Sequence, residues 1–419
     1  MNYTLMTVVI IMILAAIFLS KVCKYPRNIW VLFVSQPLVL SVSPVITFIG
    51  GLLASKIAPD PTLATLPLTI MIIGIALGTF VVAILSTKYG RKKATTLGFI
   101  NGIIATLIAM QAAITASFYL LVFAAFFLGI SLAFMQQLRF AALESVSTEE
   151  GPKVISALML SGILAAFIGP EIALMGKDWI ASPHGYAGSF LGLTVLMTFA
   201  LIIFQLFTDP HLATKEVLDT PARSLTTIIK QPIFIIAMLA AAIGYGLMSF
   251  LMTATPISMH DMMGHSLEDT KWVLQSHITA MFLPSLITGF LIKRFGSTAI
   301  MLTGTLMFAL VAVIALQGQQ VMHYWWALVL LGVGWNFLFI TGTVMLPRSY
   351  KAHERYKIQA TNDFAIFTIQ AIASLSAGWL LFASSWHTLV YVSMPFVVIM
   401  LLICYWNYCY EYKLSKQPT

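Results

Sequence analysis

The stretch Ala83-Ile-Leu-Ser-Thr-Lys-Tyr-Gly-Arg-Lys-Lys93 shows how this chain is organised, because a similar stretch recurs in its second half. The second copy reads Gly289-Phe-Leu-Ile-Lys-Arg-Phe-Gly-Ser297. In both copies an apolar run ends in basic residues and a glycine, and another apolar run follows. A turn that recurs at equivalent places indicates an internal repeat, so we expect two similar halves.

The composition indicates that the chain is surrounded by lipid. Charged residues make up 9% of the sequence, hydrophobic residues make up 59%, and the mean hydropathy is +0.93. A soluble domain carries about 25% charged residues, so an ordinary water-exposed surface is excluded. Three cysteines do not form a disulfide framework. Apolar runs of about 20 residues indicate membrane-spanning helices, so the predicted class is an all-α integral membrane protein.

The first apolar run, Thr4 to Ser20, is followed by the basic residues Lys21, Lys24 and Arg27. A signal peptide carries its positive charge before the apolar run, so we expect a retained extra transmembrane helix, with a cleaved signal peptide as the alternative. Twelve further spans are predicted near residues 28–55, 62–87, 94–115, 117–139, 153–176, 186–208, 231–256, 272–292, 298–317, 323–346, 357–383 and 386–410.

The longest polar connector runs from Thr208 to Lys230 and separates two sets of six spans. The predicted organisation is an extra N-terminal helix with a basic linker, a six-helix half, a linker, a second six-helix half and a tail, at residues 1–27, 28–208, 209–230, 231–410 and 411–419.

The basic residues predict the orientation of the spans. If the linker is cytoplasmic, 20 of the 23 Lys and Arg residues are cytoplasmic, and only Lys56, Lys177 and Lys271 lie outside. This asymmetry satisfies the positive-inside rule. It also accounts for the net charge of +8, so a nucleic-acid partner is not expected.

The basic turn resembles a loop of the major facilitator superfamily, which has the pattern G-x-L-x-D-R-x-G-R-R/K between its second and third helices. The sequence keeps Leu85 and a conformational loop of Lys88, Gly90, Arg91 and Lys92. It has Ala83 and Thr87 in place of the first glycine and the aspartate, so the usual charged latch of that loop is in question.

A second stretch also resembles this superfamily. Gly162 and Gly169-Pro170 are similar to its antiporter-type motif. The resemblance covers residues 28–410 and implies two pseudo-symmetric halves that rock around a central cavity, which gives alternating access. It further implies a multi-pass protein of the bacterial inner membrane, with the linker and the C-terminus cytoplasmic. We expect the lipid bilayer and a small transported substrate as its partners, and a monomer as its state.

Few ionisable residues are predicted at membrane depth, where their cost makes them functional candidates. Glu171 and Asp363 are candidate coupling residues, and a structural role is the alternative for each. Glu171 follows Gly169-Pro170, where a break in the helix would free backbone groups to satisfy the carboxylate. Arg139 and Glu144, near a cytoplasmic helix end, are expected to form either a gate or an end-of-helix pair.

A set of soft ligands stands out in the second half. Met248 and Met252 are one helical turn apart, and His277 and Met281 repeat that spacing on the next predicted helix. Thioethers with one imidazole and no carboxylate suit copper(I) better than magnesium, calcium or manganese. The alternative is core packing, because Met fills irregular apolar interiors. His277 differs, since a buried imidazole needs a partner.

The two pairs are similar to those of the CcoA-like copper importers, a branch of the superfamily with Met-x-x-x-Met on its seventh helix and His-x-x-x-Met on its eighth. That branch supplies copper for the assembly of haem-copper oxidases. The resemblance implies that Met248, Met252, His277 and Met281 bind copper as a transported substrate, with no permanently bound cofactor. A related subgroup of the RfnT type, which lacks the full metal motifs, is linked to riboflavin uptake.

The turn between these helices is predicted to lie outside the membrane. Its side chains are either a metal entry site or an incidental wet loop; they are Met259, His260, Met262, Met263 and His265. The neighbouring Asp261, Glu268 and Asp269 would attract cations.

The alternative to a copper importer is a transporter of a small organic solute, such as riboflavin or a drug. Aromatic and amide side chains would line its cavity, namely Trp325, Trp326, Trp335, Gln36, Gln136 and Gln137. Interfacial anchoring explains Trp325 and Trp326 equally well. An enzyme is not expected, because no nucleophile–base pair, phosphate loop or Cys-rich motif occurs in the sequence. A sensor or an assembly factor would need a soluble appendage, which the sequence does not show.

Overall fold

The structure is a computed structural model that describes the chain except for residues 1–2, 144, 147–150, 210–222, 352–353 and 417–419. The described residues form helices and no strand, which confirms the all-α class. Most of the predicted linker and the predicted pair of Arg139 and Glu144 lie outside what is described of the chain, as does the side chain of Gln137.

The helices in chain order are α1 (Tyr3–Ile17), α2 (Arg27–Leu40), α3 (Val42–Val45), α4 (Gly51–Ile57), α5 (Leu66–Tyr89), α6 (Arg91–Ile114), α7 (Phe118–Leu143), α8 (Gly151–Met175), α9 (Ala187–Phe204), α10 (Leu225–Ile229), α11 (Pro232–Pro256), α12 (Leu267–Phe282), α13 (Ser285–Phe295), α14 (Ser297–Gln317), α15 (Val321–Met345), α16 (Arg355–Ala383) and α17 (Trp386–Ser415).

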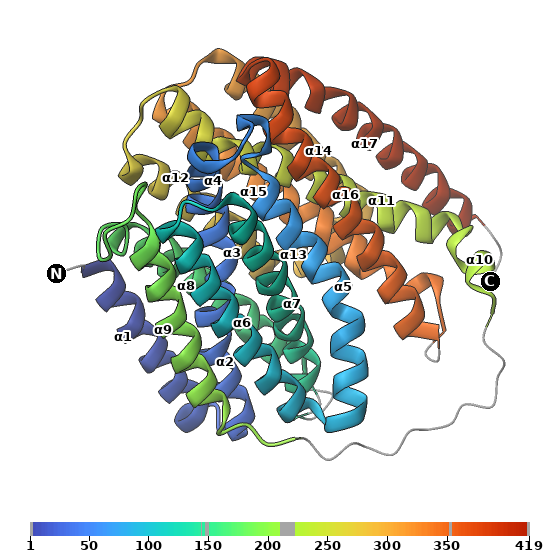
Figure 1. Cartoon of the computed structure of the whole chain (residues 1–419). Helices are drawn as coiled ribbons and strands as arrows, with labels where there is room; N and C mark the ends of the chain where they lie inside the picture. Colours follow the sequence, from blue (N-terminus) through green and yellow to red (C-terminus); the bar gives the residue numbers. More distant parts are fainter. Residues whose placement is uncertain (1–2, 144, 147–150, 210–222, 352–353, 417–419) are drawn as a thin grey trace. The chain divides into compact units, whose positions relative to one another are not determined.

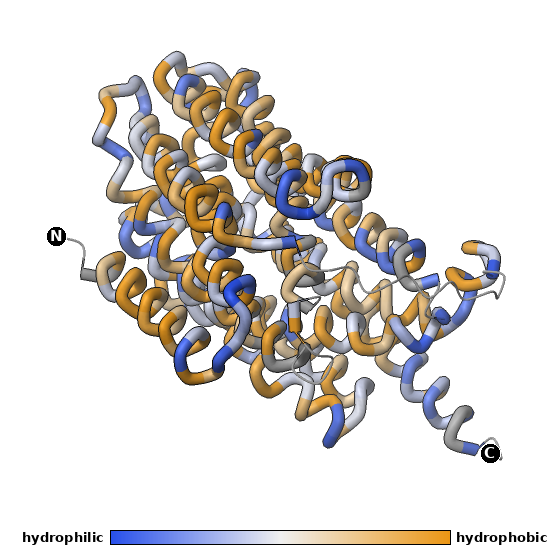
Figure 2. Tube along the Cα trace, turned by 90° about the horizontal axis from the view of Figure 1, so that it is seen from below, coloured by the Kyte–Doolittle hydropathy of each residue, from blue (hydrophilic) through white to orange (hydrophobic). Residues whose placement is uncertain are grey.

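Most of these helices are long and apolar enough to cross a membrane. Among the described residues, eleven segments pass on length and hydropathy, and α12 with α13 makes a twelfth if the pair, bent by 42°, is one span. The apolar part of α8 is shorter, at Leu160–Met175. Figure 2 shows hydrophilic residues gathered at turns and helix ends, with hydrophobic residues along the helices. The chain is therefore a multi-pass membrane protein.

The chain divides into two compact units. Unit 1 comprises Met1–Thr214 with Pro256–Gln275, and unit 2 comprises Lys215–Thr255 with Ser276–Thr419. In unit 1, α7 packs against both α5 and α6, and these three helices lie together in Figure 1. In unit 2, α14 packs against α15 and α17.

Glycines allow the closest approaches inside each unit. A Cβ atom at Gly129 of α7 would lie 2.0 Å from the carbonyl oxygen of Met71 on α5. In unit 2, a Cβ atom at Gly304 or at Gly334 would lie 3.0 Å from the carbonyl oxygen of the other. Small residues are what membrane helices use to pack, since lipid supplies no hydrophobic drive between them.

The extra helix α1 packs against α2 and α8. Only Val8 and Met12 of its described side chains are buried, so most of its surface is left for lipid. Helix α1 thus corresponds to the first apolar run, which is predicted to lie outside the two sets of six spans.

The repeated basic turn has the same backbone conformation in both copies. Gly90 ends α5 and begins α6 with φ 79° and ψ 163°, and Gly296 ends α13 and begins α14 with φ 85° and ψ 159°. Only glycine adopts this region readily. The internal repeat predicted from the sequence is therefore present in the backbone.

Candidate functional site

His277 is the buried centre of the α12–α15 contact. Its side chain is fully buried, and its Nδ1 lies 2.7 Å from the carbonyl oxygen of Leu328 on α15. A carbonyl only accepts hydrogen bonds, so Nδ1 carries the proton and Nε2 presents a lone pair. Nε2 has no hydrogen-bond partner among the described residues. A ring held by a carbonyl at one nitrogen and open at the other is oriented as metal-ligating histidines are.

Helix α15 packs closely against the backbone of α12 near His277. A Cβ atom at Gly332 would lie 2.7 Å from the carbonyl oxygen of His277 and 3.0 Å from the backbone nitrogen of Met281. Gly332 therefore serves the close packing of α15 on α12. Met281 is buried in the same contact, so His277 and Met281 are brought to one helix interface.

Asn336 explains how the bend between α12 and α13 is tolerated. Pro284 has no N–H group, and the end of α12 leaves carbonyls without helical partners. The Asn336 amide donates to the carbonyl oxygen of Met281 at 2.7 Å and to Ser285 Oγ at 2.6 Å. Thr288 donates back to Asn336 Oδ1 at 2.7 Å. Asn336 thus acts as a buried cap for a broken membrane helix.

Met248 and Met252 lie on α11, with Met248 buried and Met252 half-buried. Tyr245 precedes Met248 by three residues, so the three side chains share one face of the helix. The ring of Tyr245 contacts Trp335 and Phe339 of α15 at centroid distances of 5.1 and 5.2 Å. The methionine pair therefore lies on the helix face that carries an aromatic cluster.

Sequence reasoning missed most of this aromatic cluster, which we define as Tyr245, Trp335, Phe339 and Phe367. Trp335 and Phe339 stack at 5.0 Å with an interplanar angle of 9°, and Phe367 of α16 contacts Tyr245 at 6.2 Å. The spacing in the sequence was a usable signal, because residues three or four positions apart share a helix face. Tyr245 and Met248 are three positions apart, and Trp335 and Phe339 are four.

The two ligand pairs are positioned by different neighbours. His277 and Met281 are held against α15, and Met248 and Met252 lie beside the aromatic cluster. Phe282, next to Met281, contacts Trp335 at 6.2 Å, so the cluster has contacts with both helices that carry the pairs. Among the described residues no hydrogen bond links one pair to the other, and the quartet stays a prediction.

The other predicted tryptophans have separate roles. Trp325 donates from its indole nitrogen to Ser276 Oγ at 2.8 Å, and Trp326 has half of its side chain exposed. Both lie near the start of α15, away from the aromatic cluster in sequence. Gln36 is buried in unit 1 with its Oε1 atom lacking a described partner, whereas Gln136 is exposed.

The predicted entry turn is shorter than expected, because helical structure continues through Met262 and resumes at Leu267. Met259 is fully buried, whereas Met262 and Met263 are 43% and 45% exposed. His260 Nδ1 lies 2.9 Å from the carbonyl oxygen of His265. Met262 and Met263 are exposed, and His260 and His265 are half-buried. The metal-entry site stays a prediction.

Each acidic residue around this turn has a polar partner, which is near in sequence for Glu268 and Asp269 and lies on α4 for Asp261. Asp261 accepts a hydrogen bond from Ser55 at 2.7 Å, Glu268 pairs with Lys271 at 2.7 Å, and Asp269 accepts from Ser266. Their attraction for a passing cation is correspondingly reduced.

Glu171 is satisfied by side chains instead of by a helix break. Helix α8 is continuous through Pro170, and the buried Glu171 carboxylate lies 3.0 Å from Lys271 Nζ and 3.3 Å from Gln275 Nε2. The expected local break is therefore wrong. A Cβ atom at Gly169 would lie 2.9 Å from the carbonyl oxygen of Ser41, so this glycine serves helix packing.

Asp363 is half-buried on α16 and accepts a hydrogen bond from its neighbour Asn362 at 3.2 Å. It lies four residues before Phe367, which places its carboxylate one turn from the aromatic cluster on the same helix face.

The conformational loop contacts a carboxylate that lies more than 100 residues later in the chain, that of Asp209. Asp209, after α9, accepts from the backbone N–H of Lys92 at 2.7 Å, and its other oxygen would lie 3.0 Å from a Cβ atom at Gly90. Lys92 Nζ donates to the carbonyl oxygen of Gln205 at 2.7 Å. A carboxylate at a helix N-terminus is favourable. Asp209 thus supplies an acidic group to a loop that lacks the aspartate of its pattern.

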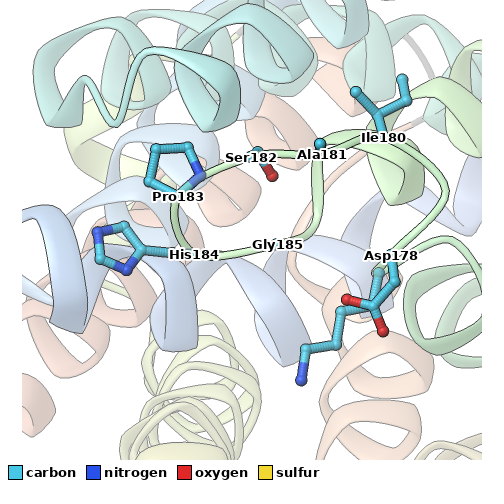
Figure 3. Close-up of a pocket in the computed structure, with 8 residues that line it drawn as sticks. Asp178, Ile180, Ala181, Ser182, Pro183, His184 and Gly185 are labelled. Carbon is cyan, nitrogen blue, oxygen red and sulfur yellow. The ribbon is translucent and has the colours of Figure 1, made fainter.

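A surface cavity of about 360 Å³ lies in the loop between α8 and α9. Figure 3 shows that the side chains lining it come from that loop alone, with His184 and Asp178 on opposite sides. It contains none of the predicted site residues.

Comparison with known proteins identifies the family. The model of the Major Facilitator Superfamily matches residues 29–270 and 237–418. The riboflavin transporter RfnT of Brucella anthropi is 37% identical over 377 residues, which cover 90% of this chain and 94% of that protein. An MFS-type transporter of Bacillus subtilis, YdeG, is 28% identical and covers 91% of this chain and 92% of its own length.

Solved structures show the same fold at low identity. A bacterial homologue of the lysosomal transporter Spinster, inward-facing and occupied, superposes with a TM-score of 0.71 at 13% identity, covering 93% of this chain and 98% of that one. A bacterial homologue of the iron transporter ferroportin, outward-facing, gives 0.61 at 16% identity, covering 90% and 98%. With its repeated basic turn, its membrane-spanning helices and a family match over nearly its whole length, the chain belongs to the major facilitator superfamily of secondary transporters, and it is not an enzyme.

Proposed function

We propose that this transporter carries a planar aromatic solute of the riboflavin class across the membrane by alternating access. One observation carries the proposal: a riboflavin transporter is 37% identical over 90% of this chain. The aromatic cluster of unit 2 supports it, because stacked and edge-on rings match a flat conjugated substrate. The proposed setting is a bacterial inner membrane, with the linker and the C-terminus in the cytoplasm.

Copper(I) is the second candidate substrate. The observation in its favour is His277, whose buried Nε2 has no described partner while Nδ1 is fixed by Leu328. Met281 lies one turn away, and Met248 and Met252 would complete a soft ligand set. The competing explanation is that the methionines fill space beside aromatic rings, where sulfur packs favourably.

A single uptake experiment separates the two substrates. Cells lacking their own riboflavin synthesis and copper import would express the wild-type chain, His277→Ala or Tyr245→Ala, and both riboflavin and copper accumulation would be measured. We expect riboflavin uptake by the wild type and its loss in Tyr245→Ala. Copper uptake that requires His277, without riboflavin uptake, would replace the first candidate by the second.

Expression controls make this comparison interpretable. Each variant must reach the membrane at the wild-type level, which immunoblotting of membrane fractions shows. Trp326→Phe is the matched control, because its ring is half exposed and lies outside the aromatic cluster. We expect its uptake of either substrate to equal that of the wild type.

The coupling ion is a further part of the proposal. Glu171 and Asp363 are the intramembrane carboxylates that we propose as coupling residues. Glu171 is buried against Lys271, and Asp363 lies a turn from the aromatic cluster, which supports separate roles for the two. The protonation of Glu171 would depend on its contact with Lys271, and the protonation of Asp363 would depend on whether the solute is bound.

A further inference from the structure

The aromatic cluster contains a buried donor that has no acceptor. Trp335 is 3% exposed, and its indole Nε1 has no hydrogen-bond partner among the described residues. A buried indole N–H normally finds an acceptor. An unpaired buried donor destabilises the fold, because it has lost its hydrogen bond to water. A protein that retains such a group at a substrate site can recover that cost when a ligand carbonyl arrives.

The rings around Trp335 leave surface uncovered. Tyr245 stands nearly perpendicular to both Trp335 and Phe339, at interplanar angles of 88° and 85°. Tyr245, Phe339 and Phe367 are only half-buried, although each contacts another ring of the cluster. Rings from α11, α15 and α16 thus lie in contact in unit 2, and three of them are partly exposed.

A carboxyl group lies one helical turn from Phe367 on α16. Asp363 precedes Phe367 by one helical turn, so its carboxylate lies on the helix face that carries Phe367. Carboxylates accept hydrogen bonds and do not donate them when ionised. The site therefore combines aromatic surface, one buried N–H donor and one carboxylate acceptor.

We propose that Trp335, Tyr245, Phe339 and Phe367 form the subsite that binds the ring system of the transported solute. The indole N–H of Trp335 donates to a ring carbonyl, and Asp363 accepts from a ring N–H. A planar heteroaromatic ring with a carbonyl beside an N–H, as in the isoalloxazine of riboflavin, satisfies all three features. An ion or an aliphatic sugar lacks the flat conjugated surface that the rings would contact. This inference rests on the proposed function and names its substrate-binding residues.

The competing explanation is that these rings only pack the helices of unit 2 together. Trp335→Phe distinguishes the two, because it keeps an aromatic ring and removes the donor. Trp386→Phe is the matched control, since Trp386 is equally buried at 3% but donates to the carbonyl oxygen of Ala315 at 3.2 Å. Removing an unpaired donor does not weaken folding, whereas removing a paired one does.

The experiment measures riboflavin binding to the purified full-length protein in detergent by quenching of flavin fluorescence, together with thermal unfolding. Lumiflavin, which carries the ring without the ribityl chain, is the second probe, and ribitol is the negative one. We expect Trp335→Phe to weaken riboflavin and lumiflavin binding about tenfold, as the loss of one buried hydrogen bond of about 1.4 kcal/mol predicts, with an unchanged melting temperature. Trp386→Phe should lower the melting temperature and keep the affinity.

The outcomes separate this inference from the proposed function. If the wild type binds riboflavin and Trp335→Phe and Tyr245→Ala bind it equally well, the subsite is wrong and the proposed function stands. If Trp335→Phe loses affinity only in proportion to a loss of folded protein, the packing explanation is correct. If the wild type binds neither flavin, the proposed function and this inference are both overturned.

Discussion

At the residue scale, two glycines carry the repeated turn, and their surroundings differ in a useful way. A Cβ atom at Gly296 would meet nothing within 4 Å, so an alanine there tests the backbone alone. At Gly90 an added Cβ atom would also come within 3.0 Å of the Asp209 carboxylate. We expect Gly296→Ala to destabilise the protein by about 1–3 kcal/mol, the cost of a residue held in this backbone region.

Thermal unfolding of the purified protein measures this effect, and Gly289→Ala is its control. Gly289 lies inside α13 with nothing within 4 Å of an added Cβ atom, and it is not among the described glycines with positive φ. Alanine there should stabilise the helix by roughly 0.5–1 kcal/mol. A Gly296→Ala protein as stable as the wild type would contradict the proposed backbone requirement.

Individual residues also mark where sequence reasoning stops. The turn glycines were predictable because the basic pattern around them repeats. The partner of Glu171 was not, since Lys271 is 100 positions away in the chain and only folding brings its Nζ atom within 3.0 Å. A weak signal existed, because Lys271 is one of only three basic residues on the predicted outer side.

At the element scale, a short segment anchors the end of the linker to the loop before α16. Arg223 donates from Nη2 and Nε to the Glu354 carboxylate at 2.6 and 2.9 Å, and also to the carbonyl oxygen of Ser349 at 3.1 Å. The hydrogen bonds from Arg223 are the main reason that the pKa of Glu354 lies well below its ordinary value of 4.5.

This pair predicts a specific pH dependence. A carboxyl whose folded-state pKa is lowered contributes stability above its unfolded pKa, and that stability is lost as the pH falls toward the folded value. Glu354→Gln should therefore lower the melting temperature at pH 7, and the difference from wild type should shrink as the pH falls below 4.5. Arg348→Gln is the control, because the pair of Arg348 and Glu411 is well exposed and should contribute little. A constant difference across pH would exclude this role of the pair.

Helices as elements were largely predictable, whereas their interruptions were not. Apolar runs placed the spans, because lipid requires every backbone group to be bonded within its own helix. The bend at Pro284 falls inside the span predicted near residues 272–292, because membrane helices tolerate a proline when a neighbour satisfies the freed carbonyls. That neighbour is Asn336, and its hydrogen bond to the carbonyl of Met281 depends on how α15 packs on α12.

At the scale of the whole molecule, the segment Pro256–Gln275 belongs to unit 1 although the chain on both sides of it belongs to unit 2. It is held there by polar links to residues of the first half, among them Lys271 to Glu171 and Asp261 to Ser55. A motion that separated the segment from α4 and α8 would have to break these links.

Removal of one partner at a time tests this account. Lys271→Gln leaves the buried Glu171 carboxylate without its cation and should cost about 3–5 kcal/mol of stability. Glu171→Gln should cost less, because Lys271 keeps the largely exposed Glu268 at 2.7 Å. The double variant should recover most of the loss, since no charge is then stranded. Thermal unfolding measures these differences, and riboflavin uptake measures their effect on transport.

Lys56→Gln provides the control, because it removes a predicted outer positive charge that is exposed on unit 1. We expect it to change neither stability nor uptake. If Glu171→Gln folds normally and binds riboflavin with wild-type affinity but accumulates it more slowly, the pair acts on the conformational step. Equal uptake by Glu171→Gln and the wild type would reduce the pair to a structural contact. Because Lys271 of this segment contacts the buried Glu171 carboxylate, the same measurement tests the proposed coupling role of Glu171.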